Sequence, residues 1–145
     1  MLQLDIIAVG RLKGGPLLDL WSDYAGRLKG WQLSLYEIDD RKATEPAILS
    51  RLDEADYAFV LDERGRPLGS WDFAQRLQAL QDKGKDKIAF VIGGADGHSD
   101  AVREKADFLL SFGIQTWPHM LARVMLAEQL YRARQIVTGH PYHRA

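Results

Sequence analysis

Four side chains with functional chemistry fall within five positions near the end of the chain: His140, Tyr142, His143 and Arg144. Tyrosine and histidine rings can stack on a nucleobase, and arginine can bind a phosphate. Two histidines without a cysteine or a nearby carboxylate leave a zinc ion short of ligands, so we expect no metal. The alternative is a frayed terminus without function. The composition of this tail favours contact with a nucleic acid.

A second chemical signal is the glycine-rich turn Gly93-Gly94-Ala95-Asp96-Gly97, which follows the apolar run 88–92. Glycines let a backbone turn sharply and let a ligand approach it closely. A dinucleotide fingerprint needs G-x-G-x-x-G and an acidic residue about 20 positions on. The chain has G-G-x-x-G instead, and Gly113 stands where the acid is expected. By itself the motif fits either a ligand site or an ordinary strand-to-helix turn.

The residues of the tail and of the glycine turn must be positioned by helices and strands. The sequence patterns predict that strands alternate with helices along the chain. The patterns predict strands at 2–9, 32–38, 57–61, 87–92 and 108–112, and helices beginning at Pro16, Thr44, Ser70, Ser99 and Pro118, the last ending near Val137. Thr44 and Ser70 are predicted helix caps, and 62–67 is predicted to be a loop. The alternation predicts a single α/β domain over 1–145, with a mainly parallel sheet and helices on both faces.

In a parallel sheet the carboxyl ends of the strands lie at one edge, where ligands bind. Leu61-Asp62, the glycine turn and Phe112-Gly113 each follow a predicted strand. We therefore expect these three strand ends to line one pocket, although three unrelated loops are the alternative.

The long helix predicted over 118–137 carries apolar residues on more than one side, among them Leu121, Met125 and Leu130. A helix that is apolar over much of its circumference is usually buried on several sides, which favours a homodimer. Glu128 and Arg132 form an i, i+4 pair, most often only a modest helix support.

Composition limits the class of protein. The chain has 145 residues, no cysteine and a net charge of -1, so a strongly basic nucleic-acid binder is not indicated. Residues 111–145 carry a net +3 and the first 110 residues carry -4, which indicates that the C-terminal part meets an anion. Neither a membrane span nor a signal peptide is predicted, which fits a cytoplasmic protein.

The whole chain resembles a known family, and its C-terminal motif is the most specific part of the resemblance. The segment Pro118-His119-Met120-Leu121-Ala122-Arg123-Val124-Met125-Leu126-Ala127-Glu128, followed by His140-Pro141-Tyr142-His143-Arg144, is similar to the signature of the ribosomal RNA large subunit methyltransferase H family. These enzymes belong to the SPOUT superfamily, and the segments 61–65 and 92–94 also match. The resemblance implies an α/β fold with a C-terminal trefoil knot, a homodimer, and S-adenosylmethionine (SAM) held in the knot. It also implies methylation of N3 of a pseudouridine in 23S rRNA, with an assembled ribosome as substrate.

The resemblance also assigns roles to residues. The implied SAM contacts are Leu61, Gly93, Phe112, Gly113, Ile114, Gln115, Thr116 and Trp117. The tail motif is implied to face the substrate, with His143, Arg144 and Tyr142 as the expected catalytic groups. Arg123, Arg132 and His140 are expected to contact RNA. This chain departs from the family at Ala95-Asp96 and at Trp117, where the family usually has other residue types.

Two other classes of protein are open at this point. One is a non-catalytic RNA- or ribosome-binding module that keeps the SPOUT fold. The other is a nucleotide-binding oxidoreductase, which is disfavoured by the missing dinucleotide fingerprint and by a chain too short for a second, substrate domain.

Overall fold

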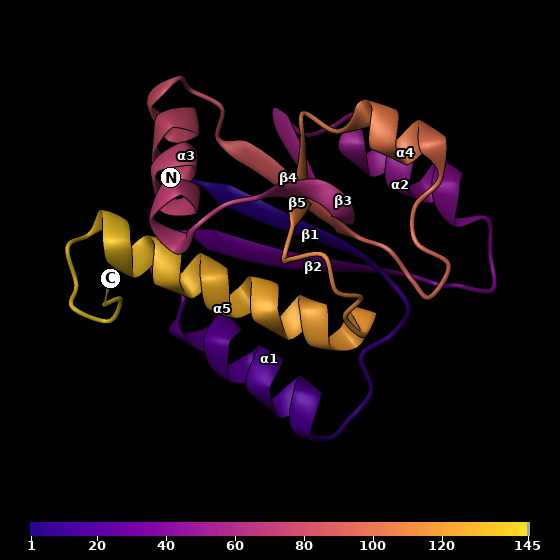
Figure 1. The fold of residues 1–145 in the computed structure, drawn as a ribbon, viewed down its shortest axis with the longest axis horizontal. Helices are drawn as coiled ribbons and strands as arrows, with labels where there is room; N and C mark the ends of the chain where they lie inside the picture. The colour runs from indigo at the N-terminus through magenta and orange to yellow at the C-terminus, as the bar shows by residue number, and fades with distance from the viewer. Residues whose placement is uncertain (145) are drawn as a thin grey trace.

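The structure is a computed structural model and describes residues 1–144 (Figure 1). Five strands alternate with five helices along the chain. In order these are β1 (Gln3–Val9), α1 (Pro16–Arg27), β2 (Gln32–Ile38), α2 (Thr44–Leu52), β3 (Tyr57–Pro67), α3 (Ser70–Asp82), β4 (Lys87–Ile92), α4 (Asp100–Lys105), β5 (Phe108–Ser111) and α5 (His119–Val137).

The five strands form one parallel sheet in the order β2-β1-β4-β3-β5. On β1, Ile6 lies between Leu35 of β2 and Phe90 of β4. All strands therefore end at the same edge of the sheet. This confirms the predicted α/β class and places the loops after β1, β3, β4 and β5 together.

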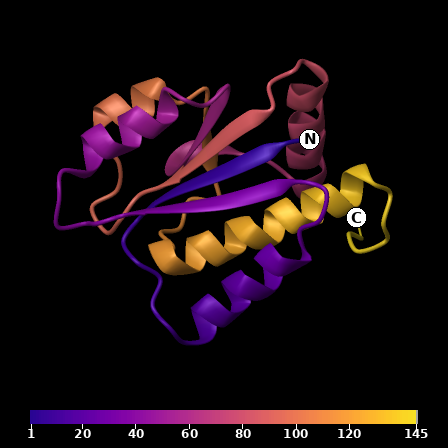
Figure 2. The same ribbon diagram turned by 180° about the vertical axis from the view of Figure 1, so that it is seen from behind.

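Helices cover both faces of the sheet. α1, α3 and α5 pack on one face around a core that includes Phe59 and Phe90, whose rings stack at 5.0 Å. α2 and α4 cover the other face through Ile48, Leu52 and Val102 (Figure 2). Strands buried on both faces carry continuous apolar runs, as β1 and β4 do. The trefoil knot implied by the resemblance stays a prediction.

β3 is longer than the sequence pattern predicts. It continues to Pro67, and Leu61 and Arg66 both align with Leu110 of β5, so residues 62–65 bulge out between them. Gly65 makes this possible, because a Cβ atom there would lie 2.5 Å from the Leu109 carbonyl oxygen. The predicted loop at 62–67 is therefore wrong: its glycine permits close approach to β5 and does not end the strand.

Two predicted helix caps are also wrong. The cap positions are Ala43 and Gly69, and neither helix has a side-chain cap. The Ser70 hydroxyl instead donates to Gln129 Oε1 at 2.7 Å and so ties α3 to α5. Within residues 1–144, no helix is long and apolar enough to cross a membrane.

Candidate functional site

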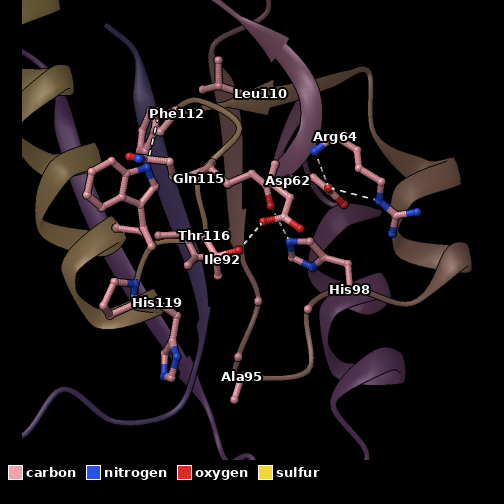
Figure 3. A pocket seen from close by; sticks show the side chains of 18 of the residues that line it. Asp62, Arg64, Ile92, Ala95, His98, Leu110, Phe112, Gln115, Thr116 and His119 are labelled. Carbon is pink, nitrogen blue, oxygen red and sulfur yellow. Dashed lines mark hydrogen bonds and ion pairs between the residues drawn. The ribbon is translucent and has the colours of Figure 1, made fainter.

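A pocket of about 720 Å³ opens at the carboxyl edge of the sheet, at the bulge of β3 and the ends of β4 and β5 (Figure 3). Leu61-Asp62, the glycine turn and Phe112-Gly113 all line it, so the prediction that these three segments share one pocket is confirmed. Leu61-Asp62 lies at the bulge of β3 and not at its end. Of the other implied SAM contacts, Gln115, Thr116 and Trp117 line the pocket. Ile114 does not line it, because its side chain points to solvent and is 93% exposed.

The glycine turn is folded tightly on itself. Gly97 donates its N–H to the Gly94 carbonyl at 3.0 Å. A Cβ atom on Gly93 would lie 3.0 Å from the Gly97 oxygen and 3.1 Å from His98 Cε1. Gly93 is therefore required by the closeness of the turn itself, and the main chain of this turn forms one wall of the pocket.

The segment 112–117 forms the opposite wall, and side-chain hydrogen bonds fix its shape. The Trp117 indole N–H donates to the Phe112 carbonyl at 3.2 Å, and the Thr116 hydroxyl donates to Glu63 Oε2 at 2.7 Å. The Ser111 hydroxyl donates to the Gly113 carbonyl at 2.8 Å. The loop is thus shaped before any ligand binds, which lowers the cost of ordering it.

Asp62, His98 and Arg103 form a connected group in the pocket lining. Asp62 was predicted to line the pocket, whereas His98 and Arg103 were given no role. Arg103 Nε lies 2.6 Å from Asp62 Oδ2. Burial alone would raise the pKa of Asp62, but hydrogen bonds from Arg103 and the Arg64 N–H hold that pKa below its usual value. His98 Nε2 lies 2.8 Å from the Leu61 carbonyl, and burial lowers the pKa of His98. A neutral imidazole therefore links β3, at the start of its bulge, to the glycine turn.

The tail folds back onto α5 and does not reach the pocket of its own chain. The Tyr142 hydroxyl donates to Glu128 Oε1 at 3.1 Å, and its ring packs edge-on against Tyr131. Arg132 lies 2.6 Å from Glu128 and 3.1 Å from His143 Nδ1. At 1.5 Å per residue, Arg132 lies about 15 Å along the helix from Ala122, which lines the pocket. The Glu128–Arg132 pair thus anchors the tail and is more than a helix support.

This docking predicts an unusual titration. Burial and the neighbouring Glu128 raise the pKa of Tyr142 to about 12, because both disfavour the phenolate. The contribution of this contact to stability is therefore present below pH 10 and lost as the pH rises toward 12. In a spectrophotometric titration, the difference between the wild type and Tyr142→Phe is expected to show one phenol that ionises near pH 12. A difference curve centred at pH 10 would show that the tail is not docked.

Arg123, which was predicted to contact RNA, lies in the interior of the chain. Its side chain is fully buried, with Nη1 2.6 Å from Glu37 Oε2 and Nη2 3.0 Å from the Gly10 carbonyl. β2 supplies Glu37 as the partner of this buried cation. Arg132 is occupied by Glu128 and His143, and its contact with RNA stays a prediction, as does that of the exposed His140.

Breaking the Arg123–Glu37 pair is expected to be costly. Arg123→Met removes the buried cation and leaves Glu37 without a charged partner, so the free energy of unfolding should fall by about 1–3 kcal/mol. Urea denaturation measures the change. The double variant Arg123→Met with Glu37→Gln should recover part of the loss, and a single variant as stable as the wild type would contradict this account.

No group of three or more histidine, aspartate and glutamate side chains within residues 1–144 could hold a metal ion. The pocket lining offers main-chain groups, the aromatic rings of Phe112 and Trp117, and polar side chains such as Asp62 and Thr116.

Comparison with known proteins gives a consistent assignment. The family described as "Predicted SPOUT methyltransferase" matches residues 2–143. Proteins named ribosomal RNA large subunit methyltransferase H from Rhodospirillum centenum and Paramagnetospirillum magneticum are 52% and 51% identical to the chain. Each alignment covers 99% of this chain, and 100% and 99% of the respective relative.

Solved structures agree on the fold. A probable methylase family protein from Haemophilus influenzae superimposes with a TM-score of 0.63 over 98% of this chain and 70% of its own, at 14% identity. A probable methyltransferase from Bordetella pertussis gives a TM-score of 0.55 over 90% of this chain and 95% of its own, at 16% identity. At these identities the likeness establishes the fold alone.

Proposed function

Because the chain belongs to the ribosomal RNA large subunit methyltransferase H family of SPOUT methyltransferases, we propose that it methylates large-subunit rRNA with SAM as the methyl donor. The acceptor that the resemblance implies is N3 of a pseudouridine in 23S rRNA. The observation that carries the proposal is the preformed pocket at the bulge of β3 and the carboxyl ends of β4 and β5. The whole chain acts as one methyltransferase domain.

The pocket fits SAM in size and in the chemistry of its walls. Small-molecule sites typically have volumes of about 300–1,000 Å³ and combine apolar walls with a few placed polar groups, and this pocket has about 720 Å³. Leu61 and Trp117 offer apolar and aromatic surface, while Gly93 and the segment 112–116 offer main-chain donors and acceptors. These residues would hold SAM, whose sulfonium supplies an electrophilic methyl group.

The acceptor nitrogen must lose its proton, and the tail supplies the groups suited to this step. An imide N–H is protonated at neutral pH, so a base or a nearby cation must ease its loss. With a pKa of about 12, Tyr142 is neutral and acts as a hydrogen-bond donor. His143 acts as the general base once its Nδ1 leaves Arg132. The exposed Arg144 stabilises the negative charge that develops on the nucleobase of the acceptor.

The position of the tail on α5 supports a dimer. In one copy the tail is anchored at Glu128 and Arg132, away from the pocket at the start of α5. The tail and the pocket can take part in one reaction only if the tail of one copy reaches the pocket of the other copy. The apolar sides of α5 are partly covered by α1 and α3 of the same chain, but Leu121 and Met125 stay partly exposed.

A second hollow offers the surface for such a partner. It has a volume of about 630 Å³, lies between α1, α3 and α5, and is lined mainly by apolar side chains, including Leu20, Tyr24, Phe112 and Met125. Leu20 is 45% exposed although it is a large apolar side chain. A second copy of this chain is the partner we propose for it.

Placing a charge in this hollow should separate the two copies. Leu20→Asp is expected to convert a dimer of about twice 16.4 kDa into a monomer, because a carboxylate would have to be buried at the interface. Light scattering at micromolar concentration measures the mass, and Leu20→Met is the control that should stay dimeric. A wild-type monomer under these conditions would refute the dimer.

The substrate is an assembled ribosome in the cytoplasm, as the resemblance implies. A net charge of -1 does not favour simple electrostatic capture of free RNA, and a large composite binding surface suits it better.

Methyl transfer itself distinguishes an enzyme from a non-catalytic ribosome-binding module of the same fold. Calorimetry should detect SAM binding, and methyl-labelled SAM should transfer its label to the 23S rRNA of ribosomes that lack the modification. Binding to ribosomes without SAM binding or transfer would establish the non-catalytic alternative.

A further inference from the structure

The loop between β1 and α1 places two cations beside the cofactor pocket. We propose that Arg11 and Lys13 bind phosphates of the RNA substrate and thereby hold it against the mouth of the pocket. This inference rests on the proposed function, and it assigns RNA contact to residues that neither the tail motif nor the long helix contains.

The loop presents both side chains on one side. Leu12 is buried in the core, and Arg11 and Lys13 on either side of it are exposed. Because Leu12 points inward, its two neighbours must point away from the core. The result is a pair of outward cations two positions apart.

The same loop is held rigidly by the buried ion pair. Glu37 Oε2 accepts the Leu12 N–H at 2.7 Å and Arg123 Nη1 at 2.6 Å, while Arg123 Nη2 donates to the Gly10 carbonyl at 3.0 Å. Arg123 therefore fixes the main chain on both sides of Arg11. A preorganised loop spends less free energy on ordering when it binds a ligand.

Two contacts place this loop next to the pocket. A Cβ atom on Gly10 would lie 3.2 Å from Met120 Cε and 3.7 Å from His119 Nε2, and His119 lines the pocket. The preceding residue, Val9, packs against the glycine turn, where a Cβ atom on Gly94 would lie 3.0 Å from Val9 Cγ1. The loop thus borders both the glycine turn and the start of α5.

Two acidic residues at the end of β2 close to the loop are paired with arginines. Glu37 is neutralised by Arg123, and Asp39 by Arg41. Within residues 1–144, neither Arg11 nor Lys13 forms an ion pair. Two unpaired, exposed cations at the rim of a site whose substrate is a polyanion are suited to phosphate oxygens.

Phosphate contacts predict a particular pattern of effects. They add affinity without touching the reacting atoms, and each one makes binding steeper in salt, by a slope of roughly 0.7–0.9 in log K against log salt concentration. Removing both cations should therefore raise KM for ribosomes and flatten the salt dependence. The Kd for SAM and the rate at saturating ribosomes should not change.

The test compares Arg11→Ala/Lys13→Ala with Lys83→Ala/Lys85→Ala. The control removes the same charge from two exposed lysines with the same spacing at the opposite edge of the sheet, just before β4. We expect KM for ribosomes to rise about tenfold at 0.1 M salt for the loop variant, on the scale of two lost phosphate contacts. The control should behave as the wild type.

Equal KM values and equal salt slopes for the two double variants would overturn the inference. A lower SAM affinity in the loop variant would also overturn it, because the loop would then act on the cofactor. Failure of the proposed function looks different: the wild type itself would bind ribosomes without transferring a methyl group. The loop can still be judged in that case, because ribosome binding at varied salt gives the same comparison.

Discussion

Replacing Gly93 by valine is expected to abolish SAM binding while the fold is retained. A Cβ atom at this position would meet the Gly97 carbonyl and the His98 ring at 3.0 and 3.1 Å, so the turn must open. The main-chain wall of the pocket is then displaced by several tenths of an ångström or more, and close backbone approach to a ligand is lost. Calorimetry should show affinity for SAM reduced about a hundredfold or more.

The control is the same substitution where there is room for it. A Cβ atom on Gly14 meets no atom within 4 Å, so Gly14→Val should leave SAM affinity unchanged. Circular dichroism and thermal melting establish that both variants are folded. A folded Gly93→Val protein with the wild-type Kd for SAM would remove the glycine turn from the cofactor site.

Deleting residues 140–145 is expected to collapse methyl transfer with SAM binding retained. The deletion removes the groups proposed to orient the base and ease its deprotonation, and leaves every pocket-lining residue in place. General acid–base catalysis typically contributes about 10²–10⁴-fold, and the rate should fall by that order. His143→Ala, a milder change, should lower turnover more than SAM affinity.

The deletion should also lower stability modestly. It removes the Tyr142–Glu128 hydrogen bond and the Tyr131–Tyr142 ring contact, which together contribute about 1–3 kcal/mol. Glu128 and Arg132 keep each other as partners, so no buried charge is abandoned. If the truncated protein methylates ribosomes at the full rate, the tail is only a packed end, and the groups that deprotonate the acceptor must lie elsewhere.

The pocket could be predicted from the sequence because its origin is topological. Parallel strands end at one edge, so residues that directly follow apolar runs, such as Asp62 and Gly93, had to meet there. The extension of β3 to Pro67 could not be predicted, because it depends on pairing with β5, a strand more than 40 positions further on. Local loop signals contain nothing about that partner.

The roles of charged side chains were the hardest to predict. Arg123 was predicted to contact RNA, yet it is fully buried and pairs with Glu37, 86 positions earlier. His98 and Arg103 form a connected group in the pocket lining with Leu61 and Asp62, and only their proximity to the glycine turn hinted at it. Such pairs are decided by tertiary contacts, for which a single sequence has no signal.

The central claim is tested most directly by mass spectrometry of 23S rRNA nucleosides from cells that lack this gene. The account predicts that N3-methylpseudouridine disappears from 23S rRNA and returns when the intact gene is restored, but not when the Gly93→Val or the tail-deleted form is supplied. An unchanged amount of N3-methylpseudouridine in the deletion strain would contradict the proposed activity.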